Sequence, residues 1–186
     1  MPILGIIASS FRSAAGPVGA YDSLATVTLS ASTTSITFAG IPTGYKHLQL
    51  RLFAKDDRAL NRDTALLRFN GDTASNYSQH TLYGDGSSAG ATAGTSTTSI
   101  EVFRVSGNSS ATNIFGAVVL DVLDYADTNK YKTSRALGGV DFNGSGEIWF
   151  TSGNWRSTAA VSSITLTPGN ATNFLQYSSF ALYGVN

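Results

Sequence analysis

The sequence predicts an all-β protein, a single β-sandwich that is most simply a jelly roll, with an N-terminal extension. Short runs rich in β-branched and aromatic residues follow one another from Tyr21 to the end of the chain. Turn-forming residues separate these runs at near-regular spacing, and no run shows a sustained helical pattern. A closed barrel is the alternative architecture, and 186 residues suit one domain of either kind.

Residues 1–20 are predicted to be the extension, and residues 21–186 the sandwich domain. The extension opens with an apolar run and continues with turn and linker residues. This run is shorter than the roughly 18 residues that a membrane span needs and lacks the basic start of a signal peptide, so no membrane insertion is expected. It is either a docking peptide that adds a strand to a partner or threads into it, or else an edge strand or a frayed terminus. The predicted docking residues are Ile3, Leu4, Ile6, Ile7 and Phe11.

The strands before the middle of the chain are predicted from alternation and turns. Lys46–Ala54 is the clearest, because Leu residues alternate with polar ones and so define one buried face. The charged segment Lys55–Asp63 is expected to be a solvated loop, and the Ser-, Ala- and Gly-rich segment Ser87–Ser99 a mobile surface loop. The other predicted strands here are Ala25–Leu29, Ser35–Phe38, Thr64–Phe69, Tyr77–Tyr83 and Ser99–Val105.

Ile114–Tyr125 is predicted to be a central strand. Its alternate residues are apolar on both sides, with Val118, Leu120 and Val122 on one face and Phe115, Ala117, Val119 and Leu123 on the other. A strand that faces water on one side should carry polar residues at every second position. We therefore expect one face to pack on the core and the other against a second layer or a neighbouring subunit.

The predicted strands after the central one complete the sheets. Gly138 and Gly139 mark a possible bulge within the first of them. These strands are Lys132–Phe142, Glu147–Thr151, Val161–Thr167 and Phe174–Val185.

The composition argues against several classes of partner. The formal net charge is zero and 13% of the residues are charged, which does not suit a nucleic-acid surface or a polybasic membrane segment. Cysteine is absent, so disulfides, thiolate catalysis and Cys-ligated metals are excluded.

The candidate catalytic and metal motifs are weak. Gly86–Gly90 matches G-x-S-x-G, but neither a helical pattern nor a histidine follows it, so a loop is favoured over a nucleophile. Carboxylates near strand ends would be needed for glycoside hydrolysis, and sequence does not give their separation. Neighbouring Asp and Asn residues offer oxygens to Ca²⁺ without a regular ligand spacing, so turn chemistry is favoured. We therefore expect a non-enzymatic protein with no catalytic residues, metal or cofactor. The carboxylates considered are Asp121, Asp124, Asp141 and Glu147.

Aromatic residues are the candidates for recognition. In Glu147–Thr151, alternation places Ile148 and Phe150 on one face and Trp149 on the other. If the first pair faces the core, Trp149 is either a sugar-stacking platform or an interface anchor; otherwise it is buried, and burial or an interface is favoured. The candidate glycan or interface residues are Tyr77, His80, Tyr83, Trp149 and Trp155.

Several stretches together resemble small virion structural proteins of tailed bacteriophages. The resemblance covers most of the chain, and its motifs are strand and turn signatures. It is carried by Ile3–Ser10, Tyr21–Val27, Ile41–Leu48, Arg68–Thr73, Asn76–Ser78 and Leu82–Gly84.

The resemblance implies a virion location and either of two roles. The first is a tail fibre, spike or baseplate-attached component that contacts the host surface, and the second is a capsid decoration protein. It also implies contacts with other virion proteins through the N-terminal segment, a homo-oligomer such as a trimer, and a host glycan as a possible ligand. A small polysaccharide depolymerase and a free carbohydrate-binding module are the competing classes.

Overall fold

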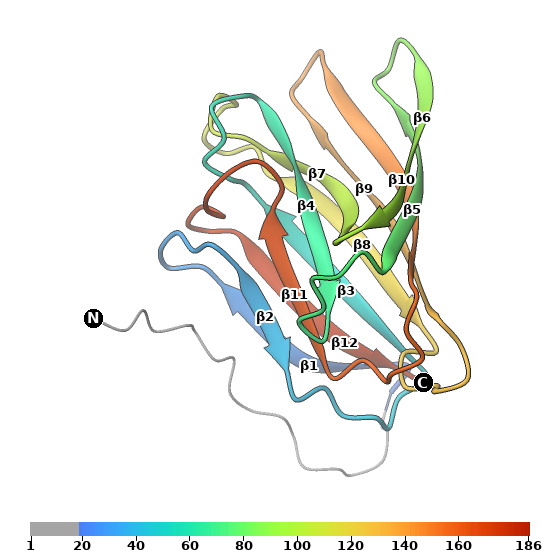
Figure 1. Cartoon of the computed structure of the whole chain (residues 1–186). Coiled ribbons are helices and arrows are strands. Elements are labelled where there is room, and N and C mark those ends of the chain that lie inside the picture. The colour runs from blue at the N-terminus through green and yellow to red at the C-terminus, as the bar shows by residue number, and fades with distance from the viewer. Residues whose placement is uncertain (1–18) are drawn as a thin grey trace.

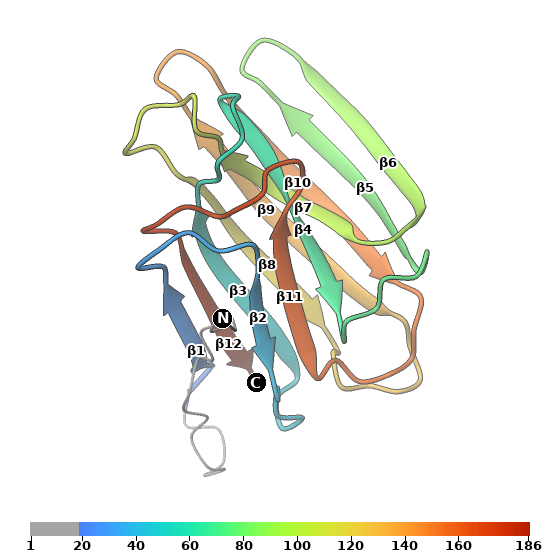
Figure 2. The ribbon, with the colours of Figure 1, turned by 60° about the vertical axis from the view of Figure 1, so that its left-hand side comes forward.

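The computed structural model describes residues 19–186, and this part of the chain contains twelve β-strands and no helix (Figure 1). The strands form two antiparallel sheets that pack face to face, which confirms the predicted all-β sandwich (Figure 2). The strands are β1 (Tyr21–Thr28), β2 (Ile36–Ala39), β3 (His47–Ala54), β4 (Arg62–Phe69), β5 (Tyr77–Gly84), β6 (Ala89–Thr97), β7 (Ile100–Ser106), β8 (Gly116–Leu123), β9 (Lys132–Asp141), β10 (Gly146–Trp155), β11 (Ser163–Pro168) and β12 (Ser179–Val185).

The strand order is that of a jelly roll with two inserted hairpins. The larger sheet has the order β1-β12-β3-β8-β9-β10-β5-β6, and the smaller has β2-β11-β4-β7. Without the hairpins β5–β6 and β9–β10, each sheet keeps four strands, β1-β12-β3-β8 and β2-β11-β4-β7, which is the eight-stranded double-sheet arrangement of a jelly roll. The hairpins extend the larger sheet beyond β8.

The core lies between the two sheets and is built from alternate residues of their strands. Leu48, Leu50 and Leu52 of β3 are buried, as the alternation predicts, and face a layer that includes Leu67 and Phe69 of β4. The other predicted strands are present with shifted bounds. The largest shift is at β12, which is predicted to begin at Phe174 and begins at Ser179.

The central strand β8 is covered on one face only. Val118, Leu120 and Val122 are buried between the sheets, as predicted. On the opposite face Val119 is 44% exposed, so no second layer from residues 19–186 covers it. Val119 is therefore left uncovered by the described part of the chain, whereas Ala117 and Leu123 on the same face are half-buried.

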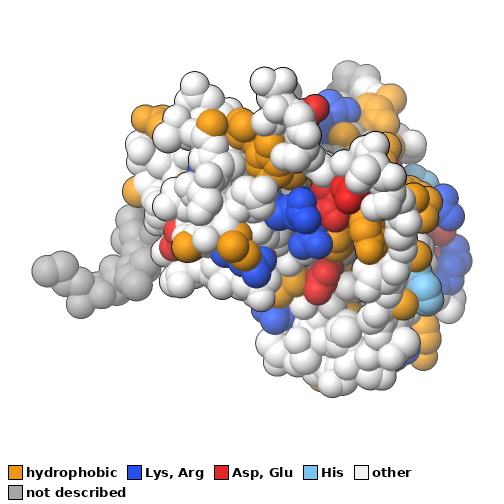
Figure 3. Space-filling model, turned by 90° about the horizontal axis from the view of Figure 1, so that it is seen from above, with side chains coloured by type: hydrophobic (Ala, Val, Ile, Leu, Met, Phe, Trp, Pro, Cys, Tyr) orange, Lys and Arg blue, Asp and Glu red, His pale blue; other side chains and the backbone are white. Residues whose placement is uncertain are grey.

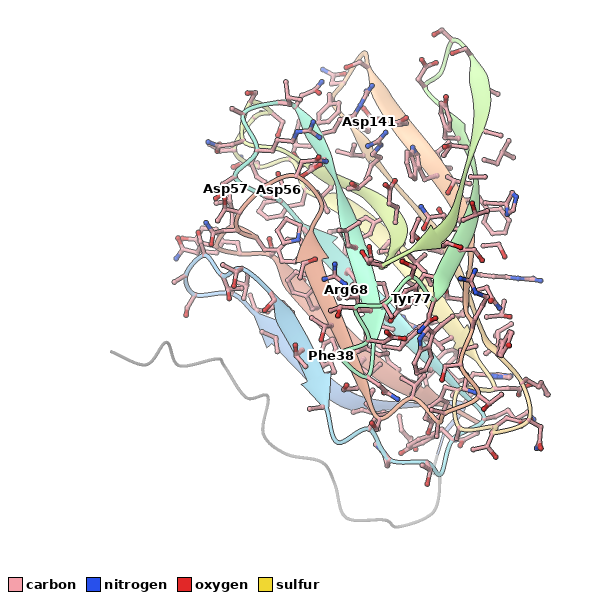
Figure 4. All side chains as sticks on the ribbon, in the orientation of Figure 1. Phe38, Asp56, Asp57, Arg68, Tyr77 and Asp141 are labelled. Atoms are coloured by element: carbon pink, nitrogen blue, oxygen red, sulfur yellow. The ribbon has the colours of Figure 1, made fainter. Side chains whose placement is uncertain are left out.

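The prediction of a solvated loop at Lys55–Asp63 is wrong. Lys55, Asp56 and Asp63 are buried (Asp56 is labelled in Figure 4). Lys55 Nζ donates to Ser110 Oγ at 2.8 Å and to the carbonyl of Ala111 at 2.7 Å, while Asp63 Oδ1 accepts from Asn170 Nδ2 at 2.7 Å. Charged groups are tolerated in the interior when such partners replace water.

Two further local predictions are corrected. The segment predicted as a mobile loop at Ser87–Ser99 contains strand β6, whose ladder to β5 shifts register only near Tyr77. Small residues fit there because β6 is an edge strand with little apolar surface to bury. Gly138 and Gly139 form no bulge, since β9 pairs in continuous register with both neighbours.

β1 begins at Tyr21, where the sandwich domain is predicted to start. The predicted docking residues Ile3, Leu4, Ile6, Ile7 and Phe11 lie outside the described residues. The extension over residues 1–20 stays a prediction.

Candidate interaction surface

The outer face of the larger sheet, turned away from the smaller sheet, carries a group of exposed apolar side chains. Each of them exposes between 44% and 60% of its surface. We call this group the apolar strip. It consists of Phe53 of β3, Leu82 of β5, Val119 of β8, Leu137 of β9, and Ile148 and Phe150 of β10.

The strand register makes the apolar strip continuous. Val119 lies opposite Leu137, Leu137 opposite Phe150, and Phe150 opposite Leu82. Residues directly opposite one another on one face of a sheet have Cβ atoms about 5 Å apart, so these four side chains form a row across four strands.

A second row runs beside the first. Phe53 lies opposite Ala117, Ala117 opposite Gly139, and Gly139 opposite Ile148. The two large side chains of this row are thus separated by two small residues. The result is a low floor next to the taller first row.

Gly139 is required at this floor. A Cβ atom there would lie 2.4 Å from the carbonyl oxygen of Glu147 on the neighbouring strand. A hollow of about 990 Å³ opens here, toward the turns of the β9–β10 and β5–β6 hairpins, and its lining includes Ala117, Leu137, Gly139 and Ile148. Side chains of a partner can enter it.

Polar groups border the strip on the side of β3 and β12. Gln49 Nε2 donates to Asp121 Oδ1 at 2.9 Å, and Arg51 Nε donates to Gln49 Oε1 at 2.9 Å. The Arg51 guanidinium lies over the rings of Tyr183, 4.7 Å from its centroid, and Tyr21, 5.3 Å away. An apolar centre with a polar border is the usual anatomy of a protein interface.

Trp149 points into the sandwich. Its exposure is expected only if Ile148 and Phe150 face the core, and these two side chains face outward instead. Ile148 is 59% exposed and Phe150 is 45% exposed, whereas Trp149 is 3% exposed. On the neighbouring strands Thr81 and Thr151 are joined by a 2.9 Å hydrogen bond on the inner face, which fixes the same orientation of β10. Trp149 is therefore a packing residue and not a sugar platform.

Around Trp149 the inner face forms a charged and aromatic cluster. The Tyr83 ring stacks on Trp149 with centroids 5.9 Å apart, and the Arg104 guanidinium lies 4.1 Å from the Trp149 centroid. Glu147 Oε2 accepts from Arg104 Nε at 3.0 Å and lies 3.3 Å from Arg62 Nε. Figure 3 looks onto the end of the sandwich that is uppermost in Figure 1, where basic side chains lie beside acidic ones. The cluster thus joins β5 and β10 of the larger sheet to β4 and β7 of the smaller sheet.

Tyr77 and Trp155 are also structural. Their rings stack with centroids 6.3 Å apart, Trp155 Nε1 donates to Asp72 Oδ2 at 2.7 Å, and the Tyr77 hydroxyl accepts from the Phe69 amide at 3.1 Å. Burial raises the pKa of Tyr77 to about 12. A glycan cannot reach these two buried rings. The five residues predicted to contact a glycan or a partner therefore do not form one surface site.

Of that set, His80 is exposed and Tyr83 is half-buried. His80 lies on the outer face of β5, two residues from Leu82, and so borders the apolar strip. The strip residues Phe53, Leu82 and Leu137 were not among the sequence candidates. The signal that pointed toward this face was the second apolar face of the central strand, which contains Val119.

The carboxylates considered for hydrolysis or metal binding have other partners. Asp121 and Glu147 are engaged as described above, and Asp141 Oδ1 accepts from the Asn143 amide at 2.7 Å. Asp124 lies 2.6 Å from Lys130 Nζ and 3.1 Å from that of Lys46, and these ammonium groups lower its pKa to about 2. Among residues 19–186 there is no group of three His, Cys, Asp or Glu side chains suited to a metal ion.

Ser88, the serine of the G-x-S-x-G match, lies in the turn between β5 and β6. Its amide donates to Asp85 Oδ1 at 2.8 Å, and the Ser87 amide donates to the same oxygen at 2.9 Å. A strand follows this turn instead of the helix that a nucleophile elbow requires. The match is a side-chain-stabilised turn.

Comparison with known proteins assigns no family. No family model matches the chain, and no curated protein shows significant similarity to it. Within the described residues there is also no helix that is long and apolar enough to cross a membrane.

Proposed function

We propose that this chain is a non-enzymatic structural protein that functions as a subunit of an assembly, in which the apolar strip is the contact surface. The observation that carries the proposal is the uninterrupted row of Val119, Leu137, Phe150 and Leu82 on a face that nothing in the described chain covers.

The size of the strip supports this role. Six large apolar side chains each expose about half of their surface, which amounts to several hundred Å² in one patch. Single exposed apolar residues are ordinary, but a contiguous patch of this size is typical of an interaction site. An uncovered patch on a regular sheet is also an aggregation hazard, which a permanent partner removes.

The more specific proposal is a virion structural protein of a tailed bacteriophage, in the tail or at the baseplate. Its supports are the sequence resemblance and the jelly-roll topology, which is frequent among virus shell proteins. The burial of Trp149 and Trp155 within the chain removes them as support for the host-contacting role, which depended in part on exposed aromatic residues. A capsid decoration protein stays the alternative.

The non-enzymatic part of the proposal is supported by the engagement of the carboxylates. Glu147 forms ion pairs with two arginines, and Asp121 accepts from Gln49. Two free carboxylates that converge on a groove are what glycoside hydrolysis needs.

The first experiment is sedimentation of the full chain and of two double variants. The strip variant Leu137→Gln with Phe150→Gln should shift an oligomer toward monomer by at least tenfold in dissociation constant. The control variant Thr37→Gln with Thr165→Gln alters the outer face of the smaller sheet, where these two hydroxyls lie 3.0 Å apart, and should leave the oligomer unchanged.

A monomeric parent chain, or equal dissociation of the strip and control variants, would contradict the assembly role. A reconstruction of the purified virion, with the sandwich fitted into its density, then tests the location. Density at the tail or baseplate supports the specific proposal, and density on the capsid lattice supports the decoration alternative.

A further inference from the structure

We infer that the apolar strip binds the N-terminal apolar segment, residues Ile3–Ile7, of a neighbouring copy of this chain. The inference rests on the proposed assembly function and names the partner of the same surface. It commits to an exchange of segments between copies, in which each copy donates one segment and receives another.

The dimensions of the strip agree with this segment. Its longer row crosses β8, β9, β10 and β5, which are three strand spacings or about 14 Å. Five extended residues span about 16 Å. The run Ile-Leu-Gly-Ile-Ile therefore has the length of the row, and its apolar side chains can pack along that row.

The floor beside the row accommodates a chain laid across the strands. Ala117 and Gly139 lie between Phe53 and Ile148, and the hollow opens over them. In an extended segment the side chains alternate between two sides. Leu4 and Ile6 can then point toward the floor while the residues on either side of them lie along its edges.

The connection is long enough to reach another copy. Residues 8–20 lie between Ile7 and Tyr21, and an extended chain from Ile7 to Tyr21 spans about 46 Å. The whole eight-stranded sheet is seven spacings wide, or about 34 Å. The segment can therefore pass beyond its own sheet.

The direction of the chain favours a neighbouring copy. Ala20 and Gly19 continue the line of β1, because their carbonyls accept from the backbone and the side chain of Asn186. The strip lies level with the C-terminal end of β1. Thr26, near that end, lies in the same row across the sheet as Arg51 and Val119, whereas Tyr21 lies at the other end of the strand. The chain thus leaves the sandwich pointing away from its own strip.

The absence of cysteine allows a direct test by disulfide trapping in the full chain. Tagged copies carrying Ile6→Cys are mixed with untagged copies carrying Leu137→Cys and oxidised mildly. A tagged-to-untagged disulfide should form at least tenfold more than with Thr37→Cys copies, in which the thiol lies on the exposed outer face of the smaller sheet.

The inference is overturned if the mixed sample gives no more cross-link than the Thr37→Cys control. It is also overturned if a chain carrying both Ile6→Cys and Leu137→Cys cross-links only within itself at low concentration, since the segment would then bind its own sheet. Sedimentation of the same samples separates the two proposals. An oligomer without the cross-link leaves the assembly role intact and points to direct sheet-to-sheet contact, whereas a chain that is monomeric and does not cross-link contradicts both.

Discussion

Asp56 gives the sharpest test of the energetics of the fold. It is fully buried, its Oδ1 accepts from the Arg58 amide at 3.1 Å, and its Oδ2 has no hydrogen-bond partner. Burial, together with the nearby carboxylates of Asp63 and Asp57, raises its pKa from 3.8 to about 7. We predict that Asp56→Asn abolishes most of the dependence of stability on pH between pH 4 and pH 8.

The sign follows from proton binding. Between pH 4 and pH 7 the folded state holds a proton on Asp56 that the unfolded state has lost, so the free energy of unfolding falls as pH rises through this window. Each pKa unit corresponds to about 1.36 kcal/mol, so the difference between 3.8 and about 7 amounts to about 4 kcal/mol at pH 8. For a domain of this size that corresponds to a change in Tm on the order of 10 °C.

The neighbouring residue provides the control. Asp57 accepts from the Thr172 amide at 2.8 Å and from Asn173 Nδ2 at 2.7 Å, and its pKa is lowered by these hydrogen bonds in spite of the opposing effect of desolvation. Asp57→Asn should therefore destabilise the protein at pH 8 and keep most of the parent slope between pH 5 and pH 8, because the Asp57 charge is the smallest of the causes that raise the pKa of Asp56. Its own contribution is lost only as pH falls below about 4.

The assay is urea unfolding of the parent and both variants at half-unit steps from pH 4 to pH 8. The parent should lose stability as pH rises, and Asp56→Asn should be the more stable protein at pH 8. If the parent is equally stable at pH 5 and pH 8, or if Asp56→Asn keeps the parent slope, the assignment of a protonated buried carboxyl is refuted.

Three further substitutions, with a fourth as a control, test close contacts, each by urea unfolding at pH 7. Lys132→Met should cost about 3 kcal/mol, because the fully buried ammonium donates to three backbone carbonyls that would lose their partner; a loss below 1 kcal/mol would contradict it. Tyr77→Phe should cost about 2 kcal/mol through the lost hydrogen bonds of its hydroxyl to the loop that follows β4, and an unchanged midpoint would exclude that role. Gly139→Ala should cost about 2 kcal/mol or more because the added methyl group meets the carbonyl of Glu147, whereas Gly144→Ala, with open space around it, isolates the effect of its positive φ.

The sequence was sufficient for features that depend on alternation and turns. The Leu residues of β3 face the core, and the jelly-roll order connects the strands that these runs predict. Asn70 and Gly71 adopt positive φ angles of 52° and 66°, as their tight-turn signature indicates. In each case the prediction depends only on residues that are close together in the sequence.

Which face of β10 points into the sandwich could not be predicted from the sequence. Alternation states that Ile148 and Phe150 share a face, but it does not state which face is inside. That choice depends on Thr81, Tyr83 and Arg104, which meet β10 across long sequence separations.

The same limit explains the segment from Lys55 to Asp63. Its charges appear solvated in the sequence because their partners, such as Ser110 and Asn170, are remote along the chain. Only the folded chain shows that these partners replace water around the charges.

The apolar strip depends on the inserted hairpins more than on the jelly roll itself. The eight jelly-roll strands contribute Phe53 and Val119, and two exposed apolar residues are ordinary on any protein surface. The β9–β10 and β5–β6 hairpins add the other four members, three in register with Val119 and Ile148 in register with Phe53, and turn a scattered pair into a continuous patch. The inner side of β9 and β10 packs against β7, an edge strand of the smaller sheet. There Arg104 of β7 lies over the Trp149 ring, and Tyr83 of β5 stacks on the same ring. Trp149 thus stabilises the hairpins from within and holds the outward-facing residues Ile148 and Phe150 of the strip in place.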